Sequence, residues 1–393
     1  MDPVRNPYAP GAGSPPPELA GRADLINNAE VALRRCQLLK PVQSPILVGL
    51  RGVGKTVLLV KIKDIAEREG FHTISIEAHE GKSLPELLVP GIRQALLKMS
   101  LIENAKEKAR RGLRVFQSFV NGAKVVINDV EIGLSISAEP GAADSGDLED
   151  DLPRLFIALG EAARASKKAV IFLIDELQYL STKEFSALIM AIHQINQQSL
   201  PVVLVGAGLP QIIGLAGNSK SYAERLFSFP SIGALHALDA RNAIVNPAKA
   251  EGVTFERGAV EQILKVTEQY PYFLQQWAHE AWNIAEGATI EAKDVLAAHN
   301  NAIAVLDGSF FKVRFDRCTP SEKKYMRALA ELGAGSHRSG DIAYELKVKT
   351  ASVAPTRSNL IKKGMIYSPS HGDTEFTVPL FDQFMKRAMP RKA

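Results

Sequence analysis

The feature that most constrains the fold is the segment Gly49 to Thr56, which reads Gly-Leu-Arg-Gly-Val-Gly-Lys-Thr. It follows the apolar run 46–50 and precedes a helix-forming run from Val57 to Glu69. A glycine-rich loop between a strand and a helix can wrap its backbone N–H groups around a phosphate, and the helix N-terminus adds a favourable dipole. The segment therefore predicts an α/β fold with a P-loop that binds a nucleotide.

The spacing of the loop assigns a role to its last two residues. Lys55 is predicted to contact the β and γ phosphates, and Thr56 is predicted to bind Mg²⁺ through its hydroxyl. ATP or ADP together with Mg²⁺ are the expected ligands. The residues predicted to surround the nucleotide are Gly49, Arg51, Gly52, Val53, Gly54, Lys55, Thr56 and Val57.

A second motif, Asp175-Glu176, ends the apolar run 169–174. The carboxyl end of a buried parallel strand is where such folds bind their ligands. Asp175 is predicted to hold the magnesium, and Glu176 to polarise the attacking water as a general base beside Lys55. The second acid favours an ATPase over a small-molecule kinase; the alternative is that the pair only caps the following helix.

Short apolar strands alternate with helices in the first half of the chain, a pattern typical of a parallel sheet with helices on both faces. A helix at 84–101 and a hairpin near 124–137 interrupt this pattern and are predicted to form an insertion. The predicted strands cover 46–50, 73–76, 169–174 and 202–205.

Composition divides the chain further. Residues 1–17 are dominated by Pro, Gly and Ala and are predicted to be a disordered tail. Residues 18–232 hold the P-loop domain, and the amphipathic helices of 233–316 predict an all-helical lid. A capping box, Thr319 to Glu322, opens a third unit at 319–393.

This third unit reads as three short helices followed by a strand, a turn and a strand, the order of a winged helix. It carries 13 Lys and Arg against 7 Asp and Glu. Duplex DNA is therefore a predicted partner, with phosphate contacts that depend on salt. Docking of a protein, or a merely solvated basic face, are the alternatives. The residues predicted to contact DNA are Lys349, Thr350, Ser352, Arg357, Lys362 and His371.

With these motifs in place, the chain resembles the AAA+ superfamily, and within it the archaeal-type ATPases between origin-recognition-like initiators and STAND ATPases. Besides the P-loop and the acid pair, Glu18 to Asp24 is similar to the Gly-Arg-acid box of these families. The resemblance implies that Arg22 lies near the base or the loop behind it; the alternative is a plain surface arginine.

The resemblance also implies roles for segments without a motif of their own. Arg225 stands where such proteins place an arginine finger that reaches a neighbouring subunit, so a homo-oligomer is expected; the alternative is a local salt bridge. Pro271 lies where initiators carry a sensor-two arginine, and is expected near the nucleotide. Gly206 to Gly208 replaces the usual polar sensor, for which backbone groups or Gln178 are the candidate substitutes.

Together these inferences predict a slow ATP-hydrolysing switch that couples nucleotide state to DNA binding through the winged helix. The alternative is a STAND-like signalling ATPase whose winged helix docks a protein partner. No apolar run approaches the roughly 18 residues of a membrane helix, and the first residues lack a secretory signal. A cytoplasmic protein without a membrane partner is therefore expected.

Overall fold

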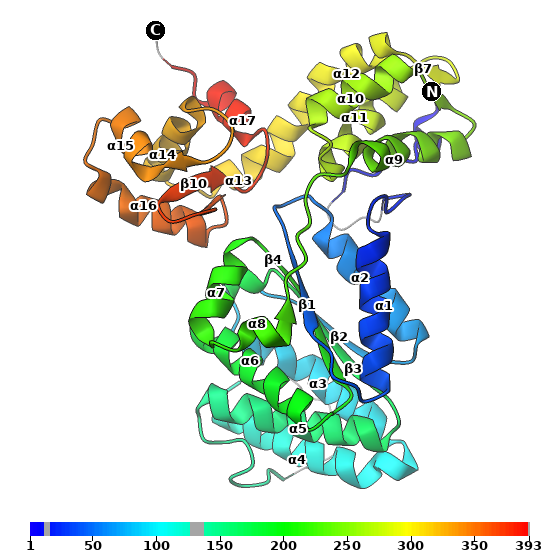
Figure 1. The fold of residues 1–393 in the computed structure, drawn as a ribbon, viewed down its shortest axis with the longest axis vertical. Helices are drawn as coiled ribbons and strands as arrows, with labels where there is room; N and C mark the ends of the chain where they lie inside the picture. The colour runs from blue at the N-terminus through cyan, green and yellow to red at the C-terminus, as the bar shows by residue number, and fades with distance from the viewer. Residues whose placement is uncertain (12–15, 126–136, 392–393) are drawn as a thin grey trace.

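The structure is a computed structural model that describes residues 1–11, 16–125 and 137–391. Figure 1 shows a sheet domain, a group of helices above it and a C-terminal unit beside that group. The hairpin predicted near 124–137 falls on 126–136, which lie outside the described residues.

A five-stranded sheet forms the centre of the first domain, and every strand pair in it is parallel. Val170–Asp175 and Val202–Gly208 are buried along their whole length, as strands covered on both faces must be. The predicted parallel sheet is confirmed. Its spatial order is β2 (His72–Glu77), β3 (Val170–Asp175), β4 (Val202–Gly208), β1 (Ser44–Val48) and β5 (Phe227–Ser228).

Helices cover both faces of this sheet. Alternate residues of β3 point to opposite sides, so Ile171 packs in the cluster of α1 and α2, whereas Phe172 packs in that of α3, α5 and α6. Helix α4 lies against α3 and α5 on the outside (Figure 1). The bounds are α1 Ala23–Gln37, α2 Lys55–Arg68, α3 Leu84–Ser100, η2 Glu103–Ala105, α4 Lys106–Gly122, α5 Leu148–Ala165, η3 Leu177–Tyr179, α6 Thr182–Gln197, α7 Gln211–Ser219 and α8 Ala223–Leu226.

The lid consists of four helices around a core that contains Trp277 and Trp282, both almost fully buried. It departs from the predicted all-helical lid in one respect, because two short strands pair in parallel beside the helices. The elements are α9 Ala237–Ala250, β6 Thr254–Phe255, α10 Arg257–Thr267, α11 Pro271–Ile284, β7 Thr289–Ile290 and α12 Ala292–Val305.

The prediction of a disordered tail is wrong for residues 1–11, which we call the lid strap. Tyr8 is 2% exposed, packs edge-on against Trp282 and donates its hydroxyl to the carbonyl of Ile244. Asn6 donates to the carbonyl of His279 at 3.1 Å. One buried aromatic ring and these hydrogen bonds offset the entropy of ordering a Pro-rich segment. The strap includes the short helix η1 (Pro3–Arg5).

The C-terminal unit contains the four helices α14 to α17 and a three-stranded antiparallel sheet of order β8-β10-β9. These are the elements predicted for a winged helix, with the additional strand β8 and a final helix α17. Pro355 does not break α16. The order from the lid is η4 Leu306–Phe311, α13 Lys312–Asp316, α14 Pro320–Glu331, β8 His337–Arg338, α15 Ser339–Glu345, α16 Thr350–Lys362, β9 Ile366–Tyr367, β10 Asp373–Phe376 and α17 Phe381–Ala388.

Among the helices of the described residues, none combines the length and the apolar character needed to cross a membrane.

Candidate nucleotide-binding site

A cavity of about 630 Å³ lies where the sheet domain, the lid and the start of the C-terminal unit meet. This volume falls in the range of small-molecule sites. The P-loop, the acid pair, the lid strap and α11 all contribute to its wall. Its predicted lining residues are Arg22, Arg51, Gly52, Val53, Gly54, Lys55, Thr56, Val57, Asp175, Glu176 and Pro271.

The P-loop folds as its sequence predicts. Gly52 and Gly54 have φ angles of 84° and 95°, which side chains with a Cβ rarely adopt. The buried ammonium of Lys55 donates to the carbonyls of Gly49 and Leu50, each at 2.9 Å. Burial lowers the pKa of Lys55 to about 8, although the nearby negative charges of Glu176 and Asp175 act to raise it. A bound anion would raise this pKa again and so stabilise the charged form of Lys55.

Thr56 and Asp175 meet at the start of α2. The Thr56 hydroxyl donates to Asp175 Oδ2 at 2.6 Å, and the other carboxylate oxygen accepts from the backbone of Glu176 at 2.8 Å. Burial is the main cause that raises the pKa of Asp175. A hydroxyl and a carboxylate side by side supply the hard oxygen ligands that Mg²⁺ prefers, so these residues fit the predicted metal site.

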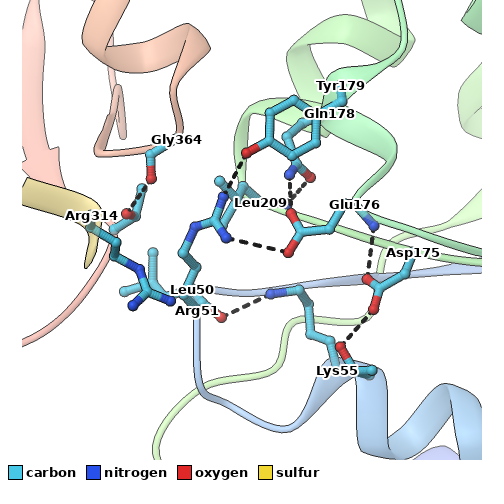
Figure 2. A network of polar contacts seen from close by, with 12 residues as sticks. Leu50, Arg51, Lys55, Asp175, Glu176, Gln178, Tyr179, Leu209, Arg314 and Gly364 are labelled. Carbon is cyan, nitrogen blue, oxygen red and sulfur yellow. Dashed lines mark hydrogen bonds and ion pairs between the residues drawn. The ribbon is translucent and has the colours of Figure 1, made fainter. Parts of the chain in front are cut away.

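Both carboxylate oxygens of Glu176 are engaged, as Figure 2 shows. Arg51 Nη1 lies 3.5 Å from Oε1, and the Gln178 amide donates to Oε2. The Gln178 oxygen in turn accepts from the backbone of Leu209 at 3.0 Å, at the end of β4. Gln178 thus connects Glu176 to the strand where a polar sensor was expected.

The glycine at the first position of the expected sensor segment, Gly206, packs closely against Leu177. A Cβ at Gly206 would lie 2.3 Å from Leu177 Cδ1, so a larger residue there would force the Leu177 side chain to move where β4 passes beneath the turn after β3. The link through Gln178 supplies a polar group at this strand without such a rearrangement.

Arg51 connects the P-loop to both other domains. Its backbone N–H donates to the carbonyl of Thr377 in the C-terminal unit at 3.2 Å, and its carbonyl accepts from the Tyr270 hydroxyl of the lid. Its guanidinium donates to the Tyr179 hydroxyl at 3.0 Å and approaches Gly364, where a Cβ would lie only 2.8 Å from Nη2. One P-loop residue therefore contacts all three parts of the molecule.

Arg314 is a cavity residue that no sequence motif predicted. It lies on α13, sits over the Phe310 ring at 4.1 Å and donates to that residue's carbonyl. Burial, and next the nearby charge of Arg51, lower its pKa to about 10. This arginine lies at the end of the predicted lid, outside any motif and away from Pro271, where the resemblance implies a lid cation in initiators.

The three residues implied by the resemblance occupy different places. Arg22 lines the cavity and donates to the carbonyls of Gly233 at 2.6 Å and Val53 at 3.3 Å, so it supports the loop behind the site. Pro271 begins α11 at the cavity wall. Arg225 is exposed on α8 outside the cavity, and no ion pair to it occurs within the described residues.

The predicted DNA-contacting residues are exposed, with one exception. Arg357 points inward and donates to Thr374 Oγ1 at 2.9 Å, to Ser368 Oγ at 2.7 Å and to the carbonyl of Asp373 at 2.6 Å. The prediction that Arg357 reads DNA is therefore corrected: the side chain holds the turn between β9 and β10 onto α16. Lys349, Thr350, Ser352, Lys362 and His371 remain at the surface.

A parallel sheet with a P-loop, and a hydroxyl and a carboxylate that fit Mg²⁺ beside it, form an arrangement typical of P-loop nucleotide-binding domains. Residues 18–205 match the family described as AAA ATPase domain, so this part of the chain is an AAA ATPase domain. Residues 308–385 match a family described only as a domain of unknown function. No sequence among the curated proteins matches the chain.

The chain is also similar to several solved structures. The Orc1 protein of Aeropyrum pernix in complex with DNA is 15% identical, with a TM-score of 0.50 over 98% of this chain and 96% of that one. Cdc6p of Pyrobaculum aerophilum is 13% identical, with a TM-score of 0.48 over 99% of each chain. The RuvB branch migration motor of Thermotoga maritima is 14% identical, with a TM-score of 0.45 over 95% of this chain and 99% of that one.

Proposed function

We propose that the protein is an ATP-binding and slowly ATP-hydrolysing switch that couples the state of its nucleotide to DNA binding by the C-terminal unit. The observation that carries the proposal is the position of Arg51. Its side chain pairs with Glu176 inside the site, while its backbone N–H bonds to Thr377 of the C-terminal unit. A nucleotide that rearranges the P-loop therefore also acts on the docking of that unit.

Magnesium held by Thr56 and Asp175 would neutralise part of the charge on the phosphates when the nucleotide binds. Lys55 would exchange its two carbonyl partners for phosphate oxygens. Glu176 would then have to leave Arg51 and Gln178 before it could polarise a water, because both of its oxygens are engaged. This requirement supports slow turnover.

DNA binding is supported by the exposed residues on and beside α16. Lys349 and Lys362 lie at opposite ends of that helix, and His371 lies in the turn before β10. Lysine contacts with phosphates would give affinity that falls with salt. The fold is similar to that of an Orc1 protein solved in complex with DNA, which adds support at the level of the fold.

One observation favours the second candidate, a STAND-like ATPase whose C-terminal unit docks a protein. The same contacts of Arg51 hold the C-terminal unit on the P-loop and engage Glu176, as expected of a form that waits for a signal. The inward position of Arg357 also removes one of the predicted DNA contacts. In this candidate the exposed face of α16 binds a protein partner.

Arg225 fits a role between subunits, because it is exposed and lies outside its own cavity. From there it would contact the γ-phosphate of a neighbouring copy and offset negative charge in the transition state. This part of the proposal requires a homo-oligomer. For the cellular location we propose the cytoplasm, which is consistent with a function on DNA.

The deciding experiment is a salt titration of duplex-DNA binding by fluorescence anisotropy, without nucleotide, with ADP and with a non-hydrolysable ATP analogue. Lys349→Ala plus Lys362→Ala should lower the salt slope by about 2, one for each phosphate contact. Lys55→Ala should abolish the difference in DNA affinity between the nucleotide states but leave the salt slope unchanged. If DNA affinity depends neither on the nucleotide nor on the double substitution, the DNA switch is rejected and the protein-docking alternative is favoured.

A further inference from the structure

A third carboxylate lines the nucleotide cavity beside the acid pair. Glu77 is the last residue of β2, is exposed, and forms part of the cavity wall together with Asp175 and Glu176. Within the part of the chain that the structure describes, its carboxylate takes part in no hydrogen bond or ion pair. Asp175 accepts from Thr56, and both oxygens of Glu176 are engaged. Glu77 therefore differs from both other acids, because its two oxygens are available to a ligand in the cavity.

The pairing of β2 with β3 places Glu77 on the same side of the sheet as the metal-binding pair. Glu77 lies opposite Asp175 in the parallel register, and residues opposite one another in neighbouring strands point to the same face. Thr73 points to this face as well, because side chains alternate along a strand, and its hydroxyl donates to Glu67 of α2 at 3.0 Å. Glu77 and Asp175 thus both face α2, whose first turn carries Thr56.

A carboxylate without a partner is unfavourable beside phosphates unless a cation lies between them. Like charges repel one another more strongly in a cavity than in open water, because the effective dielectric constant is lower there. Mg²⁺ bound to a nucleotide usually keeps several of its waters, and these waters donate hydrogen bonds to oxygen acceptors that do not touch the metal. A free carboxylate on the strand next to Asp175 suits such a contact with the waters.

We propose that Glu77 makes the cavity select the magnesium complex of the nucleotide over the metal-free nucleotide, by accepting hydrogen bonds from waters on the metal. This inference rests on the proposed nucleotide site, in which Thr56 and Asp175 hold the metal. The negative charge of Glu77 has opposite effects on the two forms of the nucleotide: it stabilises the form that carries Mg²⁺ and repels the form that does not. Glu77 is thus a specificity-determining residue that no sequence motif indicates.

The test measures binding of ADP to the full chain by isothermal titration calorimetry, once with excess Mg²⁺ and once with EDTA. Glu77→Gln keeps the shape of the side chain and removes its charge. This variant should bind ADP about threefold more weakly with Mg²⁺ and about threefold more tightly with EDTA, so the gain in affinity from Mg²⁺ should fall about tenfold. Glu80→Gln is the matched control, because Glu80 is exposed and does not line the cavity, and it should leave both affinities unchanged.

The possible failures are distinguishable. A gain in affinity from Mg²⁺ that stays the same in Glu77→Gln, or a variant that binds ADP more weakly under both conditions, would overturn the role of Glu77 while the nucleotide site stands. A wild type that binds no ADP under either condition would overturn the proposed function and this inference together. Thermal unfolding of each variant shows whether a loss of binding reflects a loss of folding.

Discussion

Arg51 Nη1 lies 3.5 Å from Glu176 Oε1, so a residue of the phosphate-binding loop holds the carboxylate predicted to act as the general base. Both side chains are more than four-fifths buried, which makes the pair stronger than an ion pair in water. The backbone of the same arginine bonds to the C-terminal unit. One residue therefore contributes both to the restraint of the predicted general base and to the docking of the C-terminal unit.

Arg51→Ala should raise the basal rate of ATP hydrolysis by about fivefold, because Glu176 loses a restraint of roughly 1 kcal/mol. The rate is measured at saturating ATP, with nucleotide affinity measured separately. Arg51→Lys should give an intermediate rate, since lysine keeps the charge but loses the planar fork. An unchanged or lower maximal rate in Arg51→Ala would contradict the restraint.

Nucleotide affinity should fall as the pH rises through and above 8. The pKa of Lys55 in the free protein is lowered to about 8, and phosphate favours the charged form, so binding raises that pKa and takes up a proton. At pH values above the pKa of Lys55 in the free protein, nucleotide affinity should drop by up to about tenfold per pH unit. Calorimetry in two buffers with different ionisation enthalpies measures the proton uptake. Lys55→Ala should abolish it, and uptake that persists in this variant would assign the proton to another group.

Arg314→Ala should weaken ATP binding by about tenfold, because its guanidinium reaches the cavity from outside the P-loop domain and can contact the phosphates. The pKa of Arg314 is lowered by burial and by the neighbouring charge of Arg51. A bound anion would offset both effects. Titration with a fluorescent ATP analogue measures the change. Arg317→Ala, three residues on and exposed, is the control; equal effects of both substitutions would exclude a specific contact.

Arg357→Ala should destabilise the C-terminal unit by about 1–3 kcal/mol, because it removes three hydrogen bonds around the turn between β9 and β10. Hydrogen exchange of that turn and denaturant unfolding measure the effect. The exposed Lys362→Ala should change stability by no more than about 0.5 kcal/mol. If Arg357→Ala keeps its stability but loses DNA affinity, the correction above is wrong and Arg357 contacts DNA.

Tyr8→Ala should destabilise the lid by about 3–5 kcal/mol, the usual cost of deleting a buried aromatic side chain. Unfolding followed by the fluorescence of the lid tryptophans measures this. Val4→Ala is the control, because Val4 lies in the same strap and is 91% exposed. Similar effects of the two substitutions would mean that the strap does not stabilise the lid through Tyr8.

The parts of the molecule that the sequence predicted well are those fixed by local chemistry. The P-loop needs its glycines at fixed spacing, and the apolar run before Asp175 can only be a buried strand, so this half of the site was predictable. The helices of the lid and the cap at Thr319 likewise follow from periodicity and capping, which depend on neighbouring residues alone.

The parts that were missed depend on contacts between distant segments. Tyr8 is buried only because α9 and α11 form a surface for it, and composition alone gave no sign of that surface. Arg357 has the residue type of a DNA contact, but its direction depends on the turn at Ser368 and Asp373. Arg314 belongs to the site only through the arrangement of the domains.

The run from α12 through η4 to α13 is unbroken helix from Ala292 to Asp316, and it joins the lid to the C-terminal unit (Figure 1). At the α-helical rise this rod is roughly 35 Å long, so a tilt of about ten degrees at the lid moves its far end by roughly 6 Å. Such a displacement exceeds the reach of any hydrogen bond between Arg51 and Thr377. In the proposed switch, the rod would therefore act as a lever, which converts a small tilt of the lid into the release or capture of the whole C-terminal unit.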